Sequence, residues 1–454
     1  MVRTSAPMSD ILKQEELEQL FHSWGKPREQ WRVGTEYEKV GIDRGSGRAI
    51  RYSGPRGVEV ILRALVEQYG WQPLEEEGHV IGLSREKAQV SLEPGGQIEL
   101  SGEPCENIHC ARAEFTQHIR ELVDVAERLD VAFLGLGMQP LSPVEEIEWV
   151  PKKRYRIMAP YMRRAGTMGH RMMKQTATVQ ANLDYRDEKD AMAKFRTAMG
   201  ICPLITAIFA NSPISEGMPN GYKSLRGHIW TRTDNDRCGL LRFAFSSDVS
   251  FAHYVDYALD VPMYFIIRDG SYINFTGVTF RRFLTHGHEG HRATEEDWEL
   301  HLTTLFPEVR IKRYMEVRSA DSQAPELMLA LPALLKGVLY EADCLEAAWD
   351  LVKGWSWDER MEAYHDSHLY ALQTRIRRYS LLDLAKELFE IAWKGLERHH
   401  ALNANGEDET IYLAPLQDII HQGKCPADLL EEQWEGELEQ DFKNLIDYSA
   451  YKLS

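Results

Sequence analysis

Four segments of the chain alternate between apolar and polar residues, which is the pattern of half-buried strands. They span residues 33–38, 97–101, 176–185 and 309–318. Because successive side chains of a strand point to opposite faces, each segment has one apolar face and one polar face. The shared pattern predicts one antiparallel sheet that buries its apolar face and leaves its polar face open.

The polar faces of these strands repeat carboxylates and carboxamides, whereas a solvated face normally mixes Lys, Thr and Ser. The repeated residues are Glu36, Glu38, Gln97, Glu99, Gln180, Asn182 and Glu316. Carboxylates that share one face repel each other, so we expect a cation among them. Oxygen ligands of this kind suit Mg²⁺ or Mn²⁺. For any single strand, a merely solvated polar face remains the alternative.

A Pro-Gly-Gly turn precedes the second of these strands. In residues 92–97 (LEPGGQ), such a tight turn would bring Glu93 close to the strand that carries Glu99. A plain hairpin turn without a functional role explains these six residues equally well.

The C-terminal part of the chain has a helical pattern instead. Residues 381–397 place apolar side chains at helical spacing, which predicts a helix with one face in the core. We therefore expect an α+β catalytic region over residues 1–335 and a helical region over residues 336–454 packed on it. With no linker between them, the two regions should form one cooperative unit.

The amino-acid composition and net charge exclude some classes of binding partner. The chain has 454 residues, with 53 Lys and Arg against 70 Asp and Glu, a net charge of −17. This negative surplus argues against nucleic acid and against anionic membranes as partners. No uninterrupted apolar run approaches the ~18 residues of a membrane span. Six scattered cysteines favour reduced thiols, and the first residues lack a signal or transit pattern, so we expect a cytoplasmic protein.

One segment inverts this charge. Residues 151–174 contain eight basic residues and no acidic one. The segment is either a solvated loop or a means of neutralising phosphates and substrate carboxylates above the acidic strands. Gly166 and Gly169 would leave it room to move, so we hypothesise a lid that keeps water from a reactive intermediate.

Several longer motifs resemble one known family. They include WRVGTEYEK at 31–39, SLEPGGQIELSG at 91–102, TVQANLDY at 178–185 and HLTTLFPEVRIKRYMEVRSAD at 301–321. In these motifs the chain resembles the plant-type and proteobacterial glutamate–cysteine ligases. The resemblance implies a fold of the glutamine synthetase and guanidino-kinase group, a large, curved, mostly antiparallel sheet with helices outside. It also implies ATP-dependent joining of the glutamate γ-carboxyl to the cysteine amine through γ-glutamyl phosphate, the first step of glutathione biosynthesis.

The resemblance assigns roles to individual residues. It implies a site for Mg²⁺, or Mn²⁺, formed by Glu36, Glu38, Glu93, Glu99, Gln180, Asn182 and Glu316. Arg318 resembles the arginine that contacts the γ-phosphate of ATP, and together with Glu316 it is expected to be catalytic. Arg226 resembles the residue that binds the glutamate α-carboxylate. Trp230, Tyr264, Arg154 and Met173 match positions around the substrate pocket. Ala177 stands where plant members carry a cysteine, which puts redox switching through that position in doubt.

Other functions keep part of this pattern. A related carboxylate–amine ligase would retain Glu36, Glu99, Glu316 and Arg318 and use another amine acceptor. A metal-dependent amidase on a similar sheet would position a water molecule and need no ATP. A catalytically silent nucleotide-binding regulator would have lost a metal carboxylate, and none is missing. The main expectation is an enzyme with glutamate, cysteine and ATP as its small-molecule substrates, acting as a monomer or a homodimer.

Overall fold

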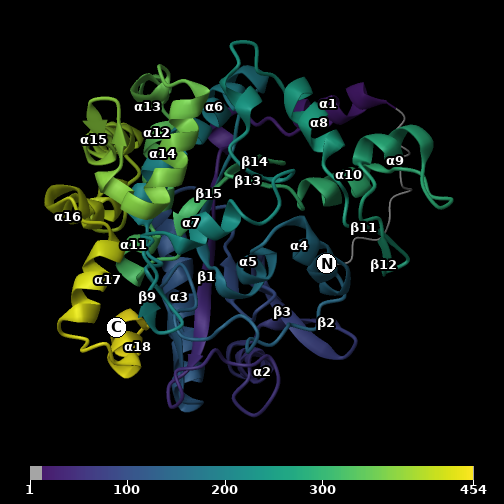
Figure 1. Cartoon of the computed structure of the whole chain (residues 1–454). Coiled ribbons are helices and arrows are strands. Elements are labelled where there is room, and N and C mark those ends of the chain that lie inside the picture. Colours follow the sequence, from purple (N-terminus) through teal and green to yellow (C-terminus); the bar gives the residue numbers. More distant parts are fainter. Residues whose placement is uncertain (1–12, 453–454) are drawn as a thin grey trace.

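A large antiparallel sheet forms the centre of the molecule. The computed structural model describes residues 13–452, and within them nine strands join this sheet with every neighbouring pair antiparallel (Figure 1). The order across the sheet is β14 (Val309–Ile311), β15 (Met315–Asp321), β7 (Thr178–Leu183), β1 (Val33–Asp43), β5 (Ile98–Ser101), β4 (Ala88–Leu92), β3 (His79–Arg85) and β2 (Gln72–Glu76), and β6 (Val131–Leu134) pairs with the end of β1. The predicted segments are therefore neighbours, and the expected α+β fold with a mostly antiparallel sheet is confirmed.

The fourth predicted strand is instead a tight hairpin. Residues 309–318 divide into β14 and β15, whose register pairs Val309 with Val317 and Arg310 with Glu316. The prediction of a single strand is wrong because residues 312–314 turn the chain, with the Lys312 N–H donating to the Tyr314 carbonyl at 2.7 Å. The predicted faces survive, because residues opposite each other in an antiparallel pair share a face.

Helices cover the apolar side of the sheet and bury it. α6 (Glu188–Phe209) packs on β15, α12 (Ala330–Leu339) on β7, α2 (Val58–Tyr69) on β3 and α3 (Ile108–Arg128) on β6. By length and composition α6 could cross a membrane, but 89% of its most apolar window is buried inside the protein. It is therefore the central helix of the core.

The N-terminal region contains further helices and two-stranded ribbons. The helices are α1 (Gln14–Ser23), α4 (Tyr155–Ala165), α5 (Gly169–Gln175), α7 (Leu225–Trp230), α8 (Phe251–Asp260), α9 (Phe280–His286), α10 (Glu295–Leu302) and α11 (Pro325–Met328). The ribbons are β8 (Ile214–Ser215) with β9 (Met218–Pro219), β10 (Cys238–Gly239) with β13 (Phe306–Pro307), and β11 (Phe265–Arg268) with β12 (Ser271–Asn274). A fourth ribbon, β16 (Arg375–Ile376) with β17 (Tyr379–Ser380), lies in the C-terminal region.

The C-terminal helices gather on one side of the molecule, at the left of Figure 1. They are α13 (Ala342–Val352), α14 (Trp357–Tyr370), α15 (Leu381–His399), α16 (Ala414–Gln422), α17 (Pro426–Glu435) and α18 (Phe442–Ser449). Gly337 on α12 and Gly395 on α15 allow these two helices to touch. A Cβ on Gly337 would lie 2.2 Å from the Ala392 carbonyl oxygen. One hydrophobic core contains residues from both predicted regions. We therefore propose that residues 336–454 fold together with the catalytic region.

Two of the six cysteines are not reduced thiols. Cys105 and Cys110 form a disulfide at the start of α3, while the other four cysteines are free. The expectation of six reduced thiols is wrong for this pair. Residues 102–107 connect β5 to α3, and the Cα atoms of the two cysteines lie 5.7 Å apart, within the usual range for a disulfide.

Candidate active site

A cavity of about 540 Å³ opens on the polar face of the sheet. Strands β1, β5, β7 and β15 supply its floor, through residues such as Glu38, Glu99 and Arg318. Helices α4 and α7 close its sides with Tyr155 and Arg226. The polar faces of strands that are far apart in the sequence thus line the same cavity.

Three carboxylates converge at one end of this cavity. Glu38, Glu93 and Glu99 each offer an oxygen atom, and these atoms lie within 4.8 Å of one another. Glu38 and Glu99 are cross-strand partners on β1 and β5. Glu93 reaches them through the Pro-Gly-Gly turn, in which the Gly96 N–H donates to the Glu93 carbonyl at 2.9 Å. The predicted approach of Glu93 to Glu99 is confirmed.

Both glycines of that turn are needed. Gly96 has φ +86°, a left-handed conformation that a residue with a Cβ rarely adopts. A Cβ on Gly95 would lie 2.3 Å from the Lys174 carbonyl oxygen. The turn therefore owes its shape both to backbone conformation and to close contact with the end of α5.

The three-carboxylate cluster fits a bound cation. Burial raises the pKa of Glu38 well above its ordinary value, and the neighbouring Glu93 and Glu99 raise it further. Burial, with Glu36 and Glu93, raises the pKa of Glu99 to about 8. The Thr178 N–H donates to Glu38 at 2.9 Å and the Ser101 hydroxyl donates to Glu99 at 2.6 Å, which holds both carboxylates in place. A divalent cation would remove the repulsion that these shifts express.

Glu316 lies in the opposite electrostatic environment. Arg310, directly across the hairpin, donates to both of its carboxylate oxygens at 2.6 and 2.8 Å. Lys312 contacts it at 2.6 Å, and Arg318 contacts it as well. Although burial alone would raise the pKa of Glu316, these three cations hold it well below its ordinary value.

Glu316 is thus paired with three cations in addition to its predicted place in the metal site. Its side chain is 0% exposed and does not line the cavity, whereas Arg310, Lys312 and Arg318 do. Glu316 thus orders a row of three positive charges that faces the cavity. Glu36 lies between the two clusters and accepts a hydrogen bond of 2.9 Å from the Asn182 amide.

The wall opposite the sheet carries unpaired donors. Arg226 and Trp230 come from α7, and Arg154 lies at the start of α4. The Trp230 Nε1 and the Arg154 Nε are buried without a hydrogen-bond partner among residues 13–452. Buried donors without partners are costly, so a polar ligand that accepts from them would be favoured.

The comparisons with known proteins agree with this arrangement. The family model of glutamate–cysteine ligase family 2 (GCS2) matches residues 32–444. The chain belongs to this family. It is 43% identical over 446 residues to glutamate–cysteine ligase B, chloroplastic, of Oryza sativa subsp. japonica, covering 97% of this chain and 88% of the relative. It is 41% identical to glutamate–cysteine ligase, chloroplastic, of Arabidopsis thaliana, covering 98% of this chain and 84% of the relative.

A solved structure shares the fold. Glutamate–cysteine ligase of Francisella tularensis in complex with AMP superimposes with a TM-score of 0.57 and 13% sequence identity, covering 92% of this chain and 87% of that one. The resemblance predicted from the motifs is therefore confirmed, and the chain is a member of an enzyme family of ligases.

The location expected from the sequence is contradicted. Its relatives in Oryza sativa, Medicago truncatula and Arabidopsis thaliana are all named chloroplastic. The cytoplasmic expectation rested partly on the first residues of the chain, and residues 1–12 lie outside the described range.

The cavity brings together most of the predicted site residues. Those that line it are Glu36, Glu38, Glu93, Glu99, Gln180, Arg154, Met173, Arg226, Trp230 and Arg318. Asn182 and Glu316 do not line it but contact residues that do, Glu36 and Arg318 respectively. The alternation of the strands placed these groups on the correct face.

Tyr264 is the exception among them. Its ring packs against the buried guanidinium of Arg237, 4.1 Å from the ring centroid, and its side chain is 1% exposed. The cavity is lined instead by the next residue, Phe265, and by Tyr272 from the paired strand. The structure thus contradicts a direct role for Tyr264 in the pocket, because β11 turns the side chain of Phe265 toward the cavity.

The basic segment is not a loose lid. It folds into α4 and α5, and only Lys152 and Arg154 of its eight basic residues line the cavity. A Cβ on Gly166 would lie 2.1 Å from the Thr233 carbonyl oxygen, and one on Gly169 would lie 2.4 Å from that of Met162. In this structure the two glycines permit close packing, a role that the sequence did not predict for them.

Two functional candidates were missed from the sequence. Arg310 and Lys312 line the cavity beside Arg318. Both lie on the polar face of residues 309–318, so their alternation with Val309 and Ile311 was the available signal. In a single straight strand Arg310 would lie far from Arg318, and the hairpin brings the two side chains to the same cavity.

Proposed function

We propose that the chain catalyses the ATP-dependent ligation of the glutamate γ-carboxyl to the cysteine amine through γ-glutamyl phosphate. The observation that carries the proposal is the division of one cavity into a three-carboxylate cluster and a row of three cations. Joining two anionic reactants requires such positive charge, and phosphoryl transfer depends on positioning more than on a nucleophilic side chain.

The cation row suits the transferring phosphoryl group. Arg318 would contact the γ-phosphate, while Arg310 from β14 and Lys312 from the turn after it would attract the same negative charge. Because Glu316 holds all three in place before the substrate arrives, little reorganisation is needed during the reaction.

The carboxylate cluster suits Mg²⁺ or Mn²⁺. Glu38, Glu93 and Glu99 would hold it, with Gln180 and Glu36 in the same cavity. Bound there, a divalent cation would screen the phosphates of ATP and the charge that develops on the leaving ADP.

The opposite wall would recognise glutamate. Arg226 would bind the α-carboxylate, and the unpaired Trp230 Nε1 would donate to the same amino acid. Apolar lining residues such as Leu74, Val90 and Phe306 would limit the access of water to the acyl phosphate before the amine attacks it. The described residues of one chain supply every group that this proposal uses, so a monomer would suffice for the chemistry.

The test is release of ADP by the purified protein with glutamate, Mg²⁺ and a panel of amines. We expect cysteine to stimulate ADP release more than any other amine, and γ-glutamylcysteine to form in equal amount. Stimulation by another amine alone would assign a different acceptor. Hydrolysis of a γ-glutamyl amide without ATP would favour an amidase and contradict the proposal.

A further inference from the structure

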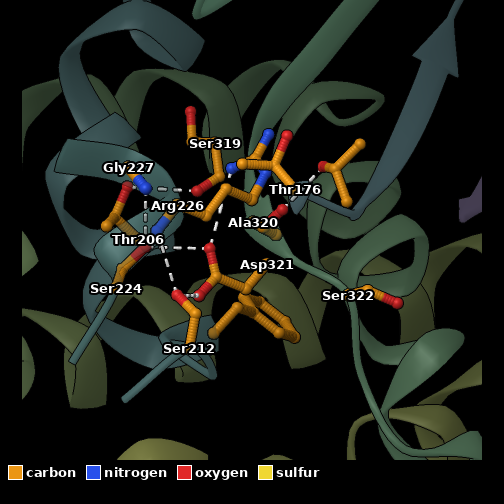
Figure 2. Close-up of polar contacts among 12 residues, drawn as sticks. Thr176, Thr206, Ser212, Ser224, Arg226, Gly227, Ser319, Ala320, Asp321 and Ser322 are labelled. Carbon is orange, nitrogen blue, oxygen red and sulfur yellow. Dashed lines mark hydrogen bonds and ion pairs between the residues drawn. The ribbon is translucent and has the colours of Figure 1, made fainter. Parts of the chain in front are cut away.

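Asp321, the last residue of β15, is buried directly behind Arg226. Its side chain is 1% exposed and does not line the cavity. One carboxylate oxygen accepts from the Asn211 N–H at 2.8 Å and from the Ser212 hydroxyl at 2.7 Å. The other accepts from the Ser224 hydroxyl at 2.8 Å and lies 3.7 Å from the Arg226 guanidinium (Figure 2).

The same two serines fix the backbone that carries Arg226. The Arg226 N–H donates to the Ser212 hydroxyl at 3.1 Å, and the Gly227 N–H donates to the Ser224 hydroxyl at 3.0 Å. Ser224 is the residue that caps the N-terminus of α7. Asp321 therefore holds both the first turn of α7 and the charged end of the arginine side chain.

Strand β15 connects this network to the phosphoryl side of the cavity. The Arg226 guanidinium donates to the Arg318 carbonyl at 2.8 Å, so it is tied to the strand at two points. Arg318 and Asp321 are three residues apart on β15, whose pairing with β7 shifts register between Val317 and Ala320. One short strand thus fixes the distance between the group that would meet the γ-phosphate and the group that would meet the glutamate α-carboxylate.

We propose that Asp321 is a positioning residue for glutamate: it aims Arg226 into the cavity and sets its distance from Arg318. The inference rests on the proposed function, in which Arg226 binds the glutamate α-carboxylate. Asp321 itself touches no substrate, so its loss should weaken glutamate binding and leave ATP binding intact.

The experiment compares Asp321→Asn with a control on α6, at a residue that contacts the same strand. Asparagine keeps the shape and removes the charge. Thr206→Val is the control, because the Thr206 hydroxyl donates to the Ser319 carbonyl at 3.1 Å, is equally buried and does not contact Arg226. We expect the KM for glutamate to rise tenfold or more in Asp321→Asn and less than twofold in Thr206→Val, with the KM for ATP within twofold in both.

A second comparison separates positioning from general loss of structure. If Asp321 acts through Arg226, adding Asp321→Asn to an Arg226→Lys variant should change the glutamate KM by less than twofold. Multiplication of the two single effects would overturn the inference, as would equal rises in the KM values for glutamate and ATP. Should Asp321→Asn fail to fold, Ser212→Ala removes one bond from each partner, and an unchanged glutamate KM there would overturn the inference.

Failure of the proposed function would look different. In that case the wild-type protein would form no ADP in response to glutamate and cysteine. Calorimetric titration with glutamate would then make the same comparison without turnover: unchanged affinity in Asp321→Asn would overturn the positioning role, and a tenfold loss confined to that variant would support it.

Discussion

Replacing Glu316 by glutamine should destabilise the metal-free protein, although a carboxylate is being removed from a site rich in carboxylates. Glutamine cannot neutralise Arg310, Lys312 and Arg318, which would then lose the carboxylate that contacts all three of them. Breaking a buried ion pair by removing one partner costs about 3–5 kcal/mol. We expect a loss of that size in the free energy of unfolding, measured by urea denaturation in the presence of EDTA.

The matched control is Glu99→Gln on the same face of the sheet, where the sign should reverse. The pKa of Glu99 is raised to about 8 from its ordinary 4.5. A raised carboxyl pKa means that stability is lost as the pH rises from about 4.5 through about 8, because the unfolded chain ionises more readily. Glutamine removes this penalty, so the metal-free variant should gain up to about 3 kcal/mol at pH 7 and almost nothing near pH 4.5.

The pair of variants separates two roles for the acidic residues. If Glu316 were chiefly a metal ligand, its removal would relieve repulsion in EDTA and stabilise the protein as Glu99→Gln does. A rise in the unfolding free energy of Glu316→Gln would therefore refute the conclusion that Glu316 orders the cation row.

Three further perturbations probe other parts of the molecule. Arg318→Ala should lower kcat by about 10²–10³ through lost stabilisation of the phosphoryl group, while Arg313→Ala, a surface residue paired with Glu299, leaves ADP release unchanged. Gly96→Ala should weaken Mn²⁺ binding, measured by calorimetry, because the substitution displaces Glu93. Its control is Gly70→Ala, which also lies at positive φ but at the end of α2, and which should leave Mn²⁺ binding unchanged. Burial lowers the pKa of His301 to about 3, so stability falls as the pH drops below about 6.5, and His301→Gln should retain about 3 kcal/mol more than wild type at pH 4.5 in urea titrations.

The amino-acid sequence alone determined which side chains share a face of the sheet. Alternation along a strand is a local property with a period of two, so Glu36, Glu38, Glu99 and Gln180 could be assigned to the polar face before their strands were paired. It held even at residues 309–318, because a hairpin keeps opposite residues on the same side. The long motifs were equally local, and they identified the family.

Only the tertiary structure decided what each polar residue contacts. The hairpin places Arg310 opposite Glu316, so that Glu316 lies at the centre of a cluster of cations that its spacing along the chain did not predict. Gly166 and Gly169 pack against carbonyl oxygens, and the basic segment that contains them forms the helices α4 and α5. The ring of Tyr264 packs against Arg237 outside the pocket, and the carboxylate of Asp321 lies behind Arg226. In each case the partner is distant in sequence or lies across a turn, and the charge or space it supplies is set by register and packing, which spacing along the chain does not encode.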